Sequence, residues 1–178
     1  MVQGDPAAAD VFFNRFGDRI NRRVRYLLGG GPNCEDVAQR VFIELIDSIH
    51  TVRNPEALNG WVSRVSTFVV SKELRRQQRG RWLSFVEETP ELPVHGGQDT
   101  GLLIPRVRAV LNRMGKTDSI VFVMRFVEEA EVSEIAASFG WSITTSRRRI
   151  QRARDVFLKK AMRDPMLASY QESLGHER

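Results

Sequence analysis

The sequence predicts an all-α protein with two small helical domains joined by a flexible acidic linker. Every strong hydrophobic periodicity in the 178 residues has three- and four-residue steps, which gather apolar side chains on one face of a helix. Residues 83–103 contain four acidic residues and no Lys or Arg, and the Pro and Gly residues between 89 and 97 exclude a helix or a central strand there. Basic segments flank this stretch, with net charges of +4 over residues 1–82 and +5 over residues 104–178.

The predicted domain boundaries follow this charge pattern. We assign residues 1–82 to a first domain, 83–103 to the linker, 104–163 to a second domain and 164–178 to a C-terminal tail, in which a short helix is one reading and disorder the other. Such a linker leads us to expect that a partner, and not an interface within the chain, sets the separation of the domains.

Composition narrows the class of protein. The net charge is +5, and no run of 18 apolar residues predicts a membrane span. The N-terminus lacks the pattern of a secretory signal. With one cysteine, Cys34, and three scattered histidines, we expect no internal disulfide, no zinc or other metal site and no cofactor. A reducing cytoplasm is the expected location.

Two helices begin the first domain. The first has an apolar face made of Phe13, Phe16, Ile20, Val24 and Leu27, and it stops at three consecutive glycines, residues 29–31. Asn33 is expected to cap the second helix, with Asp36 three residues on. The inner face of the second helix is predicted to contain Val37, Val41, Phe42, Leu45 and Ile49.

The third helix changes character along its length. Asn54 is expected to cap it and Pro55 to open it. An apolar stripe predicted to face the core consists of Leu58, Trp61, Val65 and Phe68. The same stripe continues as cations: Lys72, Arg76 and Arg79, with Arg75 beside it. These cations either meet a polyanion or belong to a solvated helix end that complements the helix dipole.

The second domain is predicted to contain a helix-turn-helix. Pro105 is expected to open a fourth helix, and Thr117 or Asp118 to cap a fifth that runs from residue 120 to 126. A short helix then ends at Gly140, and another begins at Ile143, which is expected to pack back on the turn.

The last helix has the side chains that read a major groove. Its inner seam is predicted to contain Ile143, Ser146, Ile150, Ala153 and Phe157. The opposite side carries Thr144, Arg147, Arg148, Gln151 and Arg152. Between residues 142 and 163 there are eight basic residues and one acid, which favours a nucleic acid over a merely solvated helix.

Two segments resemble conserved regions of one protein family. Residues 34–45, which read CEDVAQRVFIEL, are followed by Trp61-Val62-Ser63-Arg64-Val65 and by Arg75-Arg76. Residues 127–154 contain Glu134-Ile135-Ala136, the glycine turn and the run TSRRRIQRAR. In this order they resemble regions 2 and 4 of bacterial RNA polymerase sigma factors of the extracytoplasmic-function (ECF) type.

The resemblance implies a function and its partners. The chain would be a sigma factor that directs core RNA polymerase, through its β′ and β subunits, to promoter DNA, and an anti-sigma factor could hold it in an occluded form. The acidic linker would thread through the RNA exit channel.

The resemblance also implies three sets of site residues. Those for core polymerase are Glu35, Asp36, Gln39 and Phe42, although Asp36 could be only a cap and Phe42 only core. Those for the −10 element are Arg53, Asn54, Asn59, Arg64, Lys72, Arg75, Arg76 and Arg79. Those for the −35 element are Thr144, Thr145, Arg147, Arg148, Arg149, Gln151 and Arg152.

The sequence departs from the family pattern at a few positions. Phe68 and Lys72 replace an Asn and an Asp, Met114-Gly115 replaces Leu-Pro, and Arg40 replaces an acid. The first two departures leave the mode of −10 recognition open.

Other functions fit the sequence less well. Gly29-Gly30-Gly31 lacks the Lys and Ser/Thr of a phosphate-binding loop, and no catalytic constellation of Ser, His, Cys or carboxylates is recognisable, so we expect no enzyme. Two alternatives stay open: a conventional helix-turn-helix regulator, and a sigma-like adaptor that sequesters an anti-sigma factor.

Overall fold

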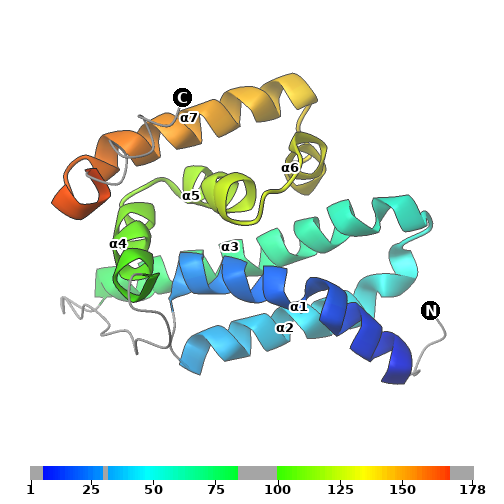
Figure 1. Cartoon of the computed structure of the whole chain (residues 1–178). Helices are drawn as coiled ribbons and strands as arrows, with labels where there is room; N and C mark the ends of the chain where they lie inside the picture. Colours follow the sequence, from blue (N-terminus) through cyan, green and yellow to red (C-terminus); the bar gives the residue numbers. More distant parts are fainter. Residues whose placement is uncertain (1–5, 30–31, 84–99, 169–178) are drawn as a thin grey trace.

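The fold consists of two helical layers with one helix at their side (Figure 1). The computed structural model describes residues 6–29, 32–83 and 100–168, with side chains over 10–29, 33–77 and 103–168, and every element in these ranges is helical. One layer contains α1 (Pro6–Leu28), α2 (Pro32–Ser48) and α3 (Leu58–Leu83). The other contains α5 (Lys116–Phe122), α6 (Val132–Phe139) and α7 (Ile143–Ala161), and α4 (Thr100–Asn112) runs beside both.

The apolar face of α1 begins one residue earlier than predicted. Phe12, Phe16, Ile20 and Val24 are buried at four-residue steps, whereas Phe13 is 52% exposed. The Phe13 ring instead packs on Phe42 of α2, with ring centroids 4.9 Å apart. The prediction that Phe13 belongs to the core is therefore wrong.

The second helix confirms its predicted inner face but not its predicted cap. Val37, Val41 and Leu45 are 0% exposed. The helix begins at Pro32, so Asn33 lies inside its first turn. Proline suits this position because its fixed φ is already helical and the missing N–H would have had no partner.

The predicted start of the third helix is confirmed. The Asn54 side chain accepts a hydrogen bond of 2.9 Å from the Glu56 backbone N–H and caps the 3₁₀ turn η2 (Pro55–Ala57), which leads into α3. A second 3₁₀ turn, η1 (Ile49–Thr51), precedes this loop.

The face of α3 that meets the core is not the predicted one. Val62, Ser66, Val70 and Glu73 are buried, but Phe68 is 64% exposed. Leu58, Trp61 and Val65 are half-buried. The core side is rotated because two serines and a threonine supply buried positions that hydrophobic periodicity does not recognise.

Helices α4 and α5 start elsewhere than predicted. Pro105 lies inside α4, which begins at Thr100. Helix α5 begins after Gly115 without a side-chain cap. The predicted cap Asp118 is instead buried and accepts from Arg152, with 3.3 Å between Oδ2 and Nε.

The helix-turn-helix is confirmed. A π-helical turn, η3 (Val123–Val127), follows α5 and leads to α6. Helix α6 ends at Gly140, whose φ of +68° lies in the left-handed region, and α7 begins at Ile143. Ser146 and Ala153 of the predicted seam are fully buried, whereas Ile143 is 42% exposed.

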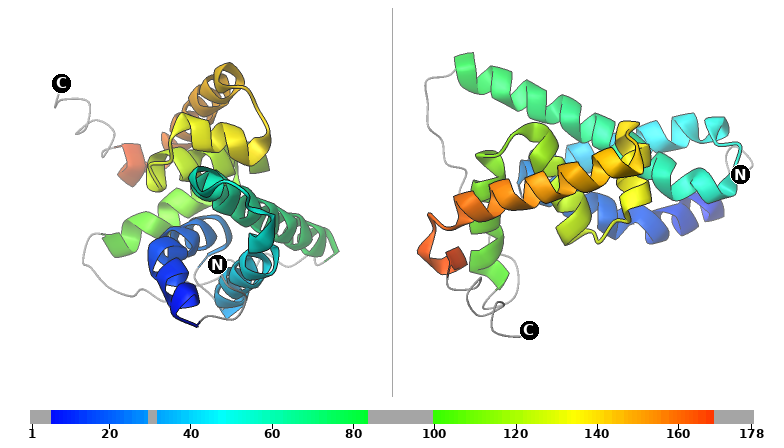
Figure 2. Two further views of the ribbon diagram at one scale, coloured as in Figure 1. Left: turned by 90° about the vertical axis from the view of Figure 1, so that its right-hand side faces the viewer. Right: turned by 90° about the horizontal axis from the view of Figure 1, so that it is seen from above.

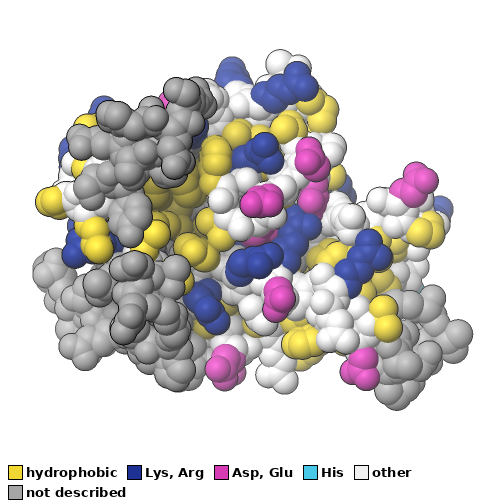
Figure 3. Space-filling model, viewed as in Figure 1, with side chains coloured by type: hydrophobic (Ala, Val, Ile, Leu, Met, Phe, Trp, Pro, Cys, Tyr) yellow, Lys and Arg dark blue, Asp and Glu magenta, His cyan; other side chains and the backbone are white. Residues whose placement is uncertain are grey.

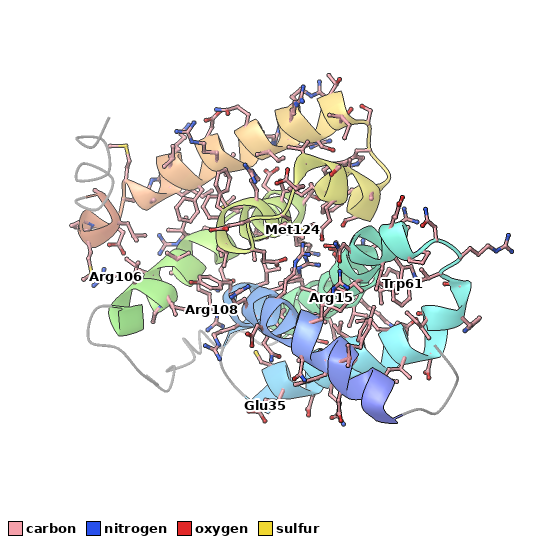
Figure 4. All side chains as sticks on the ribbon, turned by 45° about the vertical axis from the view of Figure 1, so that its right-hand side comes forward. Arg15, Glu35, Trp61, Arg106, Arg108 and Met124 are labelled. Carbon is pink, nitrogen blue, oxygen red and sulfur yellow. The ribbon has the colours of Figure 1, made fainter. Side chains whose placement is uncertain are left out.

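The two layers share one hydrophobic core, which the sequence did not predict. Helix α6 crosses over the first half of α3, and this is the most extensive helix pair in the described part of the chain (Figure 2). Met124 is fully buried between the layers, and its sulfur lies 3.8 Å from the Thr67 hydroxyl (Figure 4). The structure thus contains an interface between the layers, where the sequence analysis expected a partner to set the domain separation.

Helix α4 ties the end of α1 to the beginning of the tail. The Arg108 guanidinium donates to the Leu28 carbonyl oxygen at 3.0 Å. Gly29, with φ of +106°, makes room for it, since a Cβ there would collide with the guanidinium. On the other side of α4, Arg106 pairs with Asp164 at 2.9 Å, and Leu167 of the tail is buried (Figure 4).

Candidate nucleic-acid interface

The outer face of α7 is open to solvent along its whole first half. The Ser142 hydroxyl accepts from the Thr145 backbone N–H at 3.2 Å and fixes the start of the helix. Ser146 and Ala153 face inward, so the predicted −35 residues Thr144, Arg147 and Arg148 point away from the body of the protein. In Figure 1 this helix lies on the side of the molecule opposite α1 and α2.

The polar side chains of α7 differ in how freely they can meet a ligand. Arg152 pairs with Asp118, and the Gln151 amide donates to Asp155 at 3.0 Å. Arg149 is half-buried, with its guanidinium carbon 5.5 Å from the centre of the Trp141 ring. Half-buried Thr145 accepts from the Ser142 hydroxyl at 3.0 Å. Within the described residues, Arg147 and Arg148 are exposed without an ion pair or hydrogen bond.

The predicted −10 residues form two groups on the first layer. Arg53, Asn54 and Asn59 are exposed in and beside the loop before α3, although the Asn54 oxygen is occupied as a cap. Lys72 and Arg75 are exposed near the other end of α3. Arg79 lies in α3, but its side chain is outside the described residues.

Arg76 is held by a buried carboxylate. Its guanidinium donates to Glu73 at 2.8 Å, and Arg40 of α2 reaches the same carboxylate at 3.3 Å. The hydrogen bond from Arg76 outweighs the effect of burial and lowers the pKa of Glu73, with the charges of Arg76 and Arg40 acting in the same direction. Arg40, one of the predicted departures from the resembled pattern, therefore forms an ion pair between α2 and α3.

The Arg64 side chain forms hydrogen bonds with the second layer. Its Nε and Nη2 atoms donate to the Ala137 carbonyl oxygen of α6 at 3.0 and 2.9 Å. This carbonyl lies in the last turn of α6, where the helix leaves carbonyl groups unpaired. One predicted −10 residue is thus engaged inside the molecule.

Three of the four predicted polymerase-binding residues line a groove. Glu35, Gln39 and Phe42 border a groove of about 440 Å³ between α1 and α2, and Asp36 is exposed beside it. The sequence analysis missed Phe13 and Ile46 of the same groove. The sequence pattern could have indicated both residues. Phe13 follows Phe12, so a helix can bury only one of the two on its core side. Ile46 lies one turn beyond Phe42 on the same face of its helix.

An ion cluster between the layers was also missed. Arg23 is 2% exposed, and the Glu128 side chain is fully buried against it. Burial pushes the pKa of Glu128 upward, but the charges and hydrogen bonds of Arg23 and Arg19 outweigh it and hold that pKa below its usual value. Arg23 lies three residues after Ile20 on the apolar face of α1, and a charge at such a position indicates a buried partner.

The fold and these surfaces define a helical DNA-binding protein of the helix-turn-helix class. Sequence profiles then match most of the chain: Sigma-70 region 2 over residues 12–80 and Sigma-70, region 4 over residues 105–155. The chain therefore belongs to the sigma-70 family of RNA polymerase sigma factors, and its relatives place it in the ECF type.

Two curated relatives illustrate the similarity. The ECF sigma factor SigE of Mycolicibacterium smegmatis is 26% identical over 159 residues, which cover 85% of this chain and 62% of SigE. SigW of Bacillus subtilis is 22% identical over 176 residues, which cover 92% of this chain and 94% of SigW. The chain thus spans less than two thirds of SigE but nearly the whole of SigW.

Two solved structures share the fold. The sigma factor RpoE, in a co-crystal with the anti-sigma factor NepR from Bartonella quintana, superposes with a TM-score of 0.70 at 15% identity and covers 87% of this chain and 97% of its own. CnrH, in complex with the cytosolic domain of CnrY, gives a TM-score of 0.67 at 19% identity and covers 90% of this chain and 92% of its own.

Proposed function

We propose that this protein directs core RNA polymerase to specific promoters, with residues 1–82 binding the core enzyme and the −10 element and residues 104–163 binding the −35 element. One observation supports this division best. The same chain carries an apolar groove on α1–α2 and an arginine-bearing recognition face on α7, and both are open to solvent. A regulator that only binds DNA would need the second surface and not the first.

The −35 element is assigned to the exposed part of α7. Arg147 and Arg148 have the fork of donors that pairs with the O6 and N7 atoms of guanine in a major groove. Thr144 lies at the entrance of the same helix and can contact a phosphate or a thymine methyl group. Arg152 and Gln151 would have to exchange their acidic partners for DNA.

Core polymerase is assigned to the groove between α1 and α2. Its walls combine the rings of Phe12, Phe13 and Phe42 with the polar Gln39 and Glu35 at the rim. Such a combination suits the apolar stripe of a partner helix, with polar groups that fix its register. The coiled coil of the β′ subunit is the partner that the family resemblance implies.

The chain itself would carry out no chemical step. Its contribution to promoter opening is binding energy, because holding an extruded base offsets a few kcal/mol of unstacking. The polymerase supplies RNA synthesis. We place the protein in the cytoplasm and expect an anti-sigma factor as a further partner; no helix among the described residues has the length and apolar character to cross a membrane.

Two alternatives are less well supported. A conventional helix-turn-helix regulator does not account for the match to region 2 over residues 12–80. An adaptor that only sequesters an anti-sigma factor has no use for the exposed Arg147 and Arg148 on α7.

A pair of isoleucines on α2 tests the assignment of the groove. Ile46 lines the groove and Ile43 does not, yet they are similarly exposed, at 55% and 51%. Ile46→Glu should weaken binding to core polymerase at least tenfold in a pull-down titration, because a charge enters the apolar contact without disturbing the core. Ile43→Glu is the matched control. Equal effects of the two changes, or none from Ile46→Glu, would overturn the assignment.

A further inference from the structure

Three arginines on the first layer face the second layer. Arg19 and Arg23 lie one turn apart on α1, and Arg64 lies on α3. We call them the arginine face. Among the described residues, their ion-pair and hydrogen-bond partners outside the first layer lie in one short stretch of the second layer, residues 128–137.

The centre of this contact is a buried, bidentate ion pair. The Arg23 Nε and Nη2 atoms donate to the two Glu128 carboxylate oxygens at 2.7 and 2.6 Å. The other donors of the same guanidinium reach Ser63 and Thr67 of α3 at 3.0 to 3.1 Å. Fork-to-fork geometry of this kind is how arginine recognises either a carboxylate or a phosphate.

The flanking contacts extend this pattern toward the start of α3. Arg19 pairs with Glu128 at 3.1 Å and also with Glu134 of α6. Arg64 takes the Ala137 carbonyl oxygen with two hydrogen bonds. Beside it, Gly60 lies so close that a Cβ added there would be 3.3 Å from the Ala137 Cβ. No DNA backbone can occupy this part of α3 while α6 lies on it.

We propose that residues 128–137 are an internal, phosphate-mimicking ligand of the arginine face, so that the chain closes on itself and competes with promoter DNA for the −10 side of α3. This inference rests on the proposed function for the identity of the competing ligand. The contact between the layers does not depend on it.

The charged part of this contact can open without leaving a buried, unpaired charge. When the layers separate, Arg23 keeps its bonds to Ser63 and Thr67, which belong to its own layer. Glu128 then moves into water, where a carboxylate needs no partner. Neither charge is left buried and unpaired, which is the state that makes breaking a buried ion pair expensive. A polyanion that meets the arginine face replaces the lost carboxylates.

A reversible lock tests the competition. Gly60→Cys with Ala137→Cys, in a Cys34→Ala background, places two cysteines close to the Cβ spacing of a disulfide. The oxidised, locked protein should give at least tenfold less promoter-dependent run-off transcript with core polymerase than its reduced form. Each single cysteine variant is the control for the substitutions. Equal transcription by the locked and reduced protein, or failure of the disulfide to form, would overturn the proposal.

A second measurement uses the protein alone. Glu128→Gln keeps the shape of the side chain but removes the charge that Arg23 and Arg19 require. Amide hydrogen exchange in α6 should become at least tenfold faster, whereas the exposed Glu131→Gln should leave it unchanged. Unchanged hydrogen exchange in Glu128→Gln would overturn the proposal that Glu128 holds the two layers together. If the wild type gives no transcript with core polymerase while this exchange result holds, the proposed function fails and the internal contact stands.

Discussion

The arginines of α7 have different structural roles because their neighbouring residues differ. On α7, Arg149 stacks near Trp141 and Arg152 pairs with Asp118, so both help to hold the helix-turn-helix together. Arg147 and Arg148 have no such partner in the described structure and extend into solvent. The sequence analysis assigned all four to the −35 element, because a run of arginines does not indicate which of them already has a partner in the fold.

The first prediction concerns sequence reading by α7. Arg147→Ala or Arg148→Ala should weaken binding of the holoenzyme to its −35 element by about 1–3 kcal/mol and relax base choice there, because a bidentate base contact is lost. Lys159→Ala, about three turns further along the same helix, is the control and should keep the sequence preference. Competition binding with a randomised −35 element measures both effects. An unchanged preference in both arginine variants would refute the assignment.

The second prediction separates two adjacent arginines of α3. Arg75 is exposed, whereas Arg76 is held by Glu73. Arg75→Ala should lower the slope of log affinity against log salt concentration by about one, because one phosphate contact is lost. Arg76→Ala should change that slope less. A salt titration of promoter binding decides, and a larger effect at Arg76 would show that phosphate displaces Glu73.

The third prediction concerns Phe68, which the sequence placed in the core. Because it is 64% exposed, Phe68→Asn should change the free energy of unfolding by no more than about 0.5 kcal/mol. Val70→Ala, fully buried two residues away, should destabilise by about 2 kcal/mol. Urea denaturation compares the two. A large loss from Phe68→Asn would contradict the observed orientation of α3.

At the scale of elements, the sequence predicted well the turns that nearby residues determine. It predicted less well which side of a helix faces the core. The turn between α6 and α7 was predictable because Gly140 and the cap at Ser142 act within a few residues. The core side of α3 was not, because Ser63, Ser66 and Thr67 are buried by contacts with other helices. The start of α4 was missed because the sequence analysis took Pro105 as the first residue of the helix, whereas Pro105 lies five residues after its start at Thr100.

The fourth prediction compares two glycines. Gly140→Ala should destabilise the protein by about 1–2 kcal/mol, because its φ of +68° is unfavourable for a side chain although no atom lies within 4 Å of the added Cβ. Gly17→Ala should instead be neutral or stabilising, because its added Cβ would make only ordinary contacts with the Phe13 ring inside α1. Thermal unfolding of both variants measures the opposite signs. Equal shifts would contradict the left-handed turn.

At the scale of the whole molecule, the contact between the layers decides which surfaces are available. The face seen in Figure 3 mixes basic, acidic and hydrophobic side chains and has no patch of a single sign. Part of the basic composition is thus paired with carboxylates between the layers, at Arg19 and Arg23. Sequence could not predict this, because Glu128 pairs with residues more than 100 positions away.

The fifth prediction is the pH dependence of this contact. Because the pKa of Glu128 is lower in the folded than in the unfolded chain, its contribution to stability is complete above the unfolded pKa of about 4.3 and is lost as pH falls through the folded pKa. Stability should therefore hold between about pH 6 and 8 and decline below about pH 4. Urea denaturation should show part of that decline missing in Glu128→Gln but not in Glu131→Gln. Identical acid profiles in all three proteins would contradict the buried ion pair.

The most direct test of the account is run-off transcription by core polymerase on fragmented genomic DNA, with and without the purified protein. The account predicts discrete new start sites, each preceded by two shared sequence elements, and co-elution of the protein with core polymerase on a sizing column. Specific DNA binding without co-elution and without new start sites would contradict it and would identify a helix-turn-helix regulator that acts without joining the polymerase.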